Sequence, residues 1–349
     1  MSIREFISKH VLITGLIIVA ILLIIGASFC CKDDYWLLLW TNFVCINWYF
    51  LLLALGGLLL FSMQTIIPSK WFDPLKLQSL QTAGVLRFLI FSFLLVLASA
   101  HFFIDRIVES SFHTIWFHPI FLTLRAVVIL FVFYTYHYQL LRKFRNQNEQ
   151  SQKHKAIEFV IVLLLGFSLF SWDWLMSIQL DYHSALFSFY LLVSALLLIC
   201  GFLLVKNHQN NQLHSFSNDL GRLTMAISLI WFYVFFSQFL IAWYTSIPSE
   251  IAYYQHIFQW NFLPFLIISV LGNFLLPWLI LLSKNNRKST SKLYYVGLLI
   301  LIAKWFEIYL LIAPSVFKAQ TYYPIMEVGF IILAAIGIGY ILKQKTLIK

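Results

Sequence analysis

The chain has 349 residues, of which 61% are hydrophobic and only 11% are charged. A soluble globular protein carries about 25% charged residues, so this chain lacks the polar surface that a soluble protein of its length needs. Apolar stretches of about 20 residues, the length that crosses a bilayer core, recur from one end of the chain to the other. The composition excludes a soluble enzyme, a disordered chain and a protein with a single anchor. It predicts an all-α integral membrane protein, with residues 1–349 forming one polytopic membrane domain.

The net charge of +10 does not indicate a nucleic-acid partner, because the basic residues are spread between the apolar stretches. The four cysteines are Cys30, Cys31, Cys45 and Cys200, and they form neither a C-x-x-C pair nor a haem-attachment motif. Iron–sulfur ligation requires clustered thiolates. We therefore expect this chain to bind no metal, and we interpret the cysteines as small packing residues.

Hydropathy predicts ten membrane-spanning helices, which follow one another with short connections. They cover about 11–30, 37–62, 83–105, 115–139, 156–178, 184–205, 220–246, 261–283, 293–314 and 323–342.

The basic residues decide the predicted orientation. Of the 24 Lys and Arg residues, Arg125 and Lys304 lie inside spans, and only Lys32, Arg106 and Lys318 fall on the side that holds neither terminus. All the others lie on the side of the two termini. Because an excess of Lys and Arg marks cytoplasmic loops, we expect both termini in the cytoplasm.

Ionisable residues inside the spans are the strongest functional signal. A charge in a membrane helix costs about 2.5–3.5 kcal/mol on insertion scales and is usually retained for a reason. Arg125, Asp173 and Glu307 fall in the outer part of the predicted spans, whereas Glu158 sits at the inner end. The intramembrane polar chemistry is thus concentrated toward the non-cytoplasmic face.

Lys304 and Glu307 are three residues apart and share a helix face. Two interpretations stay open, an internal ion pair that neutralises itself in lipid and a proton-relay or quinol-facing pair. Asp173 lies between the indoles of Trp172 and Trp174. It is either hydrogen-bonded to neighbouring helices or a carboxyl that takes up and releases a proton.

A run of motifs over about 115–315 resembles the NrfD-like family, in particular the ActF-type membrane subunit of bacterial alternative complex III. The motifs occur in the family's order and at similar spacing. They are 124–125 (LR), 171–178 (SWDWLMSI), 219–222 (DLGR), 235–239 (FFSQF), 243–244 (WY), 247–250 (IPSE), 273–277 (NFLLP) and 304–307 (KWFE).

The resemblance implies an NrfD-like helical bundle in the bacterial inner membrane, within a complex that oxidises quinol. Electrons would pass through iron–sulfur clusters and haem c in partner subunits, and a second NrfD-like subunit would lie beside this one. The resemblance implies no redox metal in this chain. It implies structural support and proton translocation, with quinone binding as an open role.

The sequence departs from the family pattern at two places. The acid and histidine that follow the 171–178 motif in the family correspond here to Gln179 and Asp181, with His183 two residues later. The family's His-Trp-Leu-Asp reads Lys304-Trp305-Phe306-Glu307, which replaces a near-neutral switch by a group that is normally a fixed cation.

The candidate proton pathway therefore consists of Asp173, Glu307, Lys304, Asp181 and His183. The candidates for quinone contact, or for polar packing in the helix core, are Arg125, Trp172, Trp174 and Trp305. Two other functions stay open, an NrfD-like or PsrC-like membrane anchor of another iron–sulfur or molybdenum oxidoreductase, and a secondary transporter. The absence of an obvious internal repeat disfavours the transporter.

Overall fold

A computed structural model describes residues 33–99, 116, 118–178, 182–208 and 216–317, and in these ranges the chain forms helices, turns and loops without a strand. Seven of the described helical segments are long and apolar enough to cross a membrane. They are Trp40–Ile66, Ile120–Arg145, Glu149–Ile178, Phe187–His208, Ser217–Thr245, Leu263–Leu282 and Thr290–Val316.

These seven segments coincide with seven of the ten predicted spans, so the prediction of an all-α polytopic membrane protein is confirmed. The span predicted over 83–105 is described only as far as Ser99, as a short 3₁₀ turn (η2, Ala83–Val85) followed by α4 (Leu86–Ser99). The spans predicted over 11–30 and 323–342, with both termini, lie outside the described residues. The count of ten spans therefore stays a prediction.

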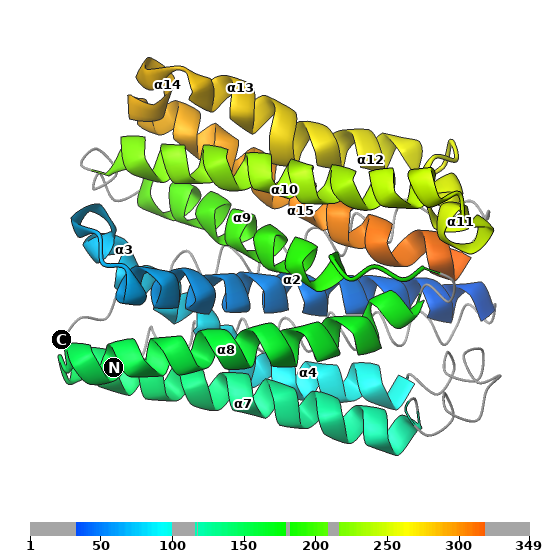
Figure 1. Ribbon diagram of the computed structural model, residues 1–349, viewed down its shortest axis with the longest axis horizontal. Coiled ribbons are helices and arrows are strands. Elements are labelled where there is room, and N and C mark those ends of the chain that lie inside the picture. Colours follow the sequence, from blue (N-terminus) through cyan, green and yellow to red (C-terminus); the bar gives the residue numbers. More distant parts are fainter. Residues whose placement is uncertain (1–32, 100–115, 117, 179–181, 209–215, 318–349) are drawn as a thin grey trace, which may run out of the picture.

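Helix α2 (Asp33–Ile66) lies between two groups of helices (Figure 1). On one side it packs with α4, α7 (Pro119–Arg145) and α8 (Glu149–Trp174), which together form the first bundle. On the other side lies the second bundle, whose members contact one another and include α9 and α15, both packed on α2. Its helices are α9 (Phe187–His208), α10 (Ser217–Thr245), α12 (Leu263–Val270) with α13 (Leu276–Leu282), and α15 (Thr290–Phe317).

Burial separates the central helices from the peripheral ones. In the most apolar windows of α2, α9 and α15, 83%, 89% and 78% of the residues are buried, against 28–33% for α7, α10 and the α12–α13 segment. A helix that is apolar all round belongs in the interior of a bundle or against lipid. The peripheral helices therefore present apolar side chains such as Phe131, Tyr233 and Ile267 to the surroundings.

Small residues let the central helices approach closely. Gly56 of α2 faces the backbone of Ala195 on α9, and Gly201 of α9 faces Gly297 of α15. In a lipid environment, where apolar burial between helices gains little, this close backbone contact is a main source of association energy. The α2–α9–α15 core is thus held by surface complementarity between helices.

The connections at one end of the molecule carry the basic residues. This end holds the turn between α7 and α8, with α3 (Asp73–Thr82) and α14 (Lys284–Lys288), and we call it the basic end (Figure 1). The other end holds α11 (Pro248–Ile257) and the start of α9, and we call it the opposite end. In the predicted orientation, the basic end would face the cytoplasm.

Replacing Gly56 by alanine is expected to destabilise the fold by about 1–3 kcal/mol, the usual cost of overpacking. The added Cβ would lie 2.2 Å from the Ala195 carbonyl oxygen, which is backbone and cannot move aside alone. Gly84→Ala is the control, because a Cβ there meets nothing within 4 Å. Thermal unfolding of the purified protein measures both. Equal stability of the two variants would contradict close α2–α9 packing.

Candidate functional site

The candidate site is centred on Lys304 and Glu307, one turn apart on α15. Their side chains are almost completely buried, with 0% and 2% of each residue exposed. The lysine Nζ lies 2.5 Å from the glutamate Oε2. The pair forms the ion contact that its three-residue spacing predicts, and it does so inside the second bundle and away from its surface.

Three other elements supply hydrogen-bond donors to Glu307. The Ser194 hydroxyl of α9 donates to Oε1, and so does the Trp231 indole N–H of α10 at 3.0 Å. The Asn273 amide donates to Oε2 at 3.0 Å. Lys304 also donates to the Ser194 hydroxyl oxygen at 3.1 Å, and its ammonium lies 4.7 Å from the centre of the Trp231 ring. We call Ser194, Trp231, Asn273, Lys304 and Glu307 the buried cluster.

The donors around Glu307 match the hydrogen-bonding capacity of an ionised carboxylate. An ionised carboxylate only accepts hydrogen bonds and has about four lone-pair sites. Glu307 receives bonds from Lys304, Ser194, Trp231 and Asn273. The cluster therefore stabilises a glutamate anion beside a lysine cation, with no net charge, which is the condition for burying an ion pair at tolerable cost.

A proline explains how Asn273 reaches the cluster. In a regular α-helix the Asn273 carbonyl would accept a bond from the N–H of residue 277, and Pro277 has none. The chain forms a short π-helix here, η5 (Leu271–Leu275), and the Ser228 hydroxyl of α10 donates to that carbonyl at 2.6 Å. Such π-turns are frequent at functional sites. The bulge directs the Asn273 side chain toward Glu307 on α15.

A second buried ion pair lies in the first bundle. Arg125 of α7 and Asp173 of α8 are 2.6 Å apart (Nε to Oδ2), with side chains 11% and 5% exposed. The Trp116 indole donates to Asp173 at 3.1 Å, and the Arg125 guanidinium lies 4.1 Å from the Trp116 ring centre and 4.9 Å from that of Phe121. Asp173 thus contacts the Arg125 cation and the Trp116 indole. Hydrogen bonding of this kind is one of the two interpretations that the sequence allowed for Asp173.

The structure does not gather all the predicted site residues. Asp173 and Glu307 bind different partners in different bundles. Asp181 lies outside the described residues, and His183 is exposed in the segment that precedes α9. Of the candidate proton carriers that the structure describes, Asp173 and Glu307 therefore belong to two separate ion pairs, and only Lys304 and Glu307 contact each other.

The tryptophans of the candidate list have separate environments. Trp305 is buried, 6.0 Å from the Tyr49 ring. The indole nitrogens of Trp172 and Trp174 are buried without an acceptor in the described part of the chain. The same is true of the Arg125 Nη1 and Nη2 atoms. These N–H groups are free to bind an acceptor such as a carbonyl oxygen.

Sequence reasoning missed three residues of the buried cluster. Ser194 lies in a charge-free span, and Trp231 resembles an ordinary core aromatic residue. Asn273 stands in the 273–277 motif, but the motif alone assigned it no role. Only the helix arrangement brings these three donors to one carboxylate.

In the described ranges, no group of three or more His, Cys, Asp or Glu side chains is placed to hold a metal ion.

A comparison with models of known protein families finds none that matches the chain, and a comparison with curated proteins finds no match either. The chemistry of this protein must therefore be argued from its own residues.

Lys304→Met is expected to lower the free energy of unfolding by about 3–5 kcal/mol, because it leaves the Glu307 carboxylate buried without a cation. The control is Lys155→Met. Lys155 and Glu158 form a pair with the same three-residue spacing, but 28% and 47% of their side chains are exposed. Exposed pairs contribute about 0–1 kcal/mol.

Denaturant unfolding of both variants, together with Lys304→Met/Glu307→Gln, measures the difference. The double variant should recover part of the loss, since it removes the unpaired charge. If Lys304→Met costs no more than Lys155→Met, Glu307 does not depend on Lys304 for its charge.

Proposed function

We propose that this chain is a membrane subunit of a quinol-oxidising respiratory complex of the alternative complex III type, where it supports the assembly and moves protons. The observation that carries the proposal is the buried Lys304–Glu307 pair inside a bundle of apolar spans. Ionisable groups at such positions are costly and commonly belong to proton pathways. The motif run over 115–315 supports the choice of complex, since Asp173, Asn273 and Glu307 all fall within its motifs.

The pair places its two ionisable groups one after the other along the bundle axis. Lys304 lies about 4.5 Å nearer the basic end than Glu307, from the 1.5 Å rise per residue of a helix. A net charge inside the bundle would cost several kcal/mol. Uptake of a proton at Glu307 is therefore coupled to release of one from Lys304, because only the combined change leaves the cluster uncharged.

One proton crosses the buried cluster in three steps. A proton from the opposite end forms an O–H bond on Glu307. Lys304 gives one N–H proton to water toward the basic end and becomes a neutral amine. The Glu307 proton then crosses the 2.5 Å contact to the lysine Nζ, which restores the ion pair. One proton has moved across the cluster, and the reverse order moves it back.

The remaining parts of the proposal follow from the same resemblance. Electrons would travel through iron–sulfur and haem c subunits, with a second NrfD-like subunit beside this chain in a bacterial inner membrane. For a quinone, the candidate contacts in this chain are the N–H groups of Arg125, Trp172 and Trp174, because they lack acceptors in the described part of the chain and a quinone presents carbonyl oxygens.

Glu307→Gln in the whole complex is expected to reduce quinol-coupled proton movement by at least about ten-fold, since a positioned proton-transfer group contributes about 10²–10⁴-fold. Asp173→Asn tests the second carboxyl in the same way. Glu158→Gln is the control, because its side chain is exposed and pairs only with Lys155 in the described structure.

Proton release by membrane vesicles during quinol oxidation provides the measurement. Wild-type proton movement in Glu307→Gln would refute the proposed transfer through Glu307. Wild-type movement in Asp173→Asn would leave that carboxyl with a packing role.

A further inference from the structure

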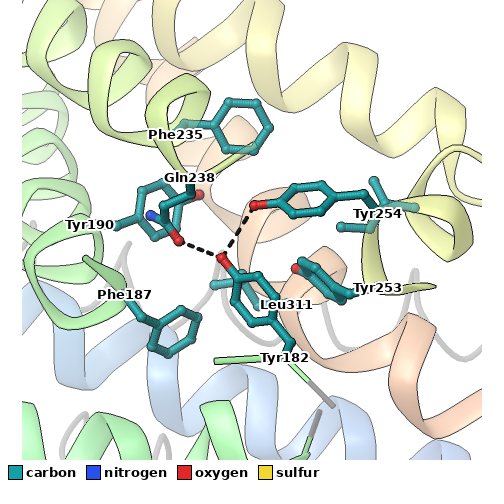
Figure 2. A pocket seen from close by; sticks show the side chains of 9 residues that line it. Tyr182, Phe187, Tyr190, Phe235, Gln238, Tyr253, Tyr254 and Leu311 are labelled. Carbon is teal, nitrogen blue, oxygen red and sulfur yellow. Dashed lines mark hydrogen bonds between the residues drawn. The ribbon is translucent and has the colours of Figure 1, made fainter. Parts of the chain in front are cut away.

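A small cavity, lined mostly by apolar atoms with a few hydroxyl and amide groups among them, lies in the second bundle (Figure 2). Its volume is about 20 Å³, which accommodates one water molecule. The Tyr182 hydroxyl donates to the side-chain amide oxygen of Gln238 at 2.8 Å and lies 3.2 Å from the Tyr254 hydroxyl. Tyr190 and Leu311 also line the cavity. The Tyr182 and Tyr254 hydroxyls and the Gln238 side-chain amide are the polar groups of the lining that an ordered water would bond.

The cavity and the buried cluster are built on the same helices. Helix α9 gives Ser194 to the cluster and Tyr190, one turn earlier, to the cavity. Helix α15 gives Glu307 to the cluster and Leu311, one turn later, to the cavity. Residues four apart share a helix face. The cavity is therefore the next layer of the bundle beyond the cluster.

Helix α10 continues the same pattern. Trp231 belongs to the cluster, and Gln238, seven residues further toward the opposite end, borders the cavity. Seven residues are two helical turns, about 10.5 Å, so both side chains lie on one face. The polar groups of the cavity thus stand in line with the cluster along the bundle axis.

Tyr190 connects the two layers. It is 3% exposed and lines the cavity, and it lies on α9 one turn before Ser194, whose hydroxyl donates to the Glu307 carboxylate. Its ring packs against Trp231 and Phe235, with centroids 6.1 and 6.2 Å away. The Tyr190 side chain therefore lies between the cavity, which it lines, and Trp231, which bonds the Glu307 carboxylate.

We propose that the cavity is a water site and that Tyr190 passes protons between this water and Glu307, so that the cluster communicates with the opposite end of the protein. The inference rests on the proposed function and names the route to its central carboxyl. A hydronium in the cavity gives a proton to the Tyr190 oxygen as the tyrosine's own proton moves to Glu307. One water and one unchanged tyrosine remain, and one O–H bond has formed on the carboxyl.

The beginning of the route lies at the segment before α9. Tyr182 belongs to this segment and is buried, whereas the next residue, His183, is exposed. The Tyr182 hydroxyl thus reaches from the end of the bundle to the cavity residues Gln238 and Tyr254. The route leaves out Asp173, which is paired with Arg125 in the first bundle.

Tyr190→Phe tests the inference, because it removes the hydroxyl and keeps the ring. The full-length purified protein is exposed to a rapid fall in pH, and infrared spectroscopy follows the appearance of the protonated Glu307 carboxyl, identified by its loss in Glu307→Gln. Tyr190→Phe should slow the uptake at least about ten-fold while its final extent stays the same, since the variant removes a proton-transfer group.

The control is Tyr49→Phe, which also deletes a buried hydroxyl. The Tyr49 hydroxyl donates to the Leu301 carbonyl oxygen at 3.1 Å and lies outside the cavity lining, so this variant should take up protons at the wild-type rate. A general loss of packing would slow both variants and would overturn the assignment of Tyr190.

Two negative results are distinguishable. If Glu307 takes up protons equally fast in Tyr190→Phe and in the wild type, the route through Tyr190 is wrong and the proposed function is unaffected. If Glu307 takes up no proton in the wild type at any pH at which the protein stays folded, both the route and the proposed proton transfer are refuted.

Discussion

A lysine and a glutamate that share the interior of an apolar bundle must satisfy each other's charge, and the second bundle is organised around this requirement. Three other helical elements converge on Glu307, and each supplies a donor to its carboxylate, as does Lys304 of the same helix. The desolvation cost of a buried pair is offset only when the remaining lone pairs are also bonded. Ser194, Trp231 and Asn273 meet that condition, so the positions of α9, α10 and η5 around α15 are all tied to one ion pair.

The backbone adapts to the same requirement. Pro277 removes a helical hydrogen bond, the π-helix accommodates the loss, and Ser228 binds the carbonyl that is left. Close packing of Gly272 against Ala303, the residue before Lys304, brings η5 near α15. Substitutions at Pro277 or Gly272 would therefore alter the electrostatics of Glu307 without touching its side chain, which couples backbone geometry to the proposed proton chemistry.

The sequence predicted the parts of this structure that depend on local patterns. Hydropathy located the seven described spans, and three-residue spacing placed Lys304 and Glu307 on one face. The partners of each acid could not be predicted, because they come from helices far apart in the chain. Ser194, Trp231 and Arg125 lie 113, 76 and 48 residues from the acids they contact, and nothing local to the sequence pairs them. Depth placed Asp173 and Glu307 toward the same face, but which cation each would bind depends on the two-bundle arrangement.

The most direct measurement is to purify this chain from native membranes in mild detergent, identify the accompanying proteins by mass spectrometry and record a reduced-minus-oxidised spectrum of the same sample. The proposed function predicts haem c absorbance, a large iron–sulfur subunit and a second polytopic membrane subunit. A chain that purifies alone and without colour would contradict the respiratory function. That result would favour a secondary transporter with the buried Lys304–Glu307 pair as its central site.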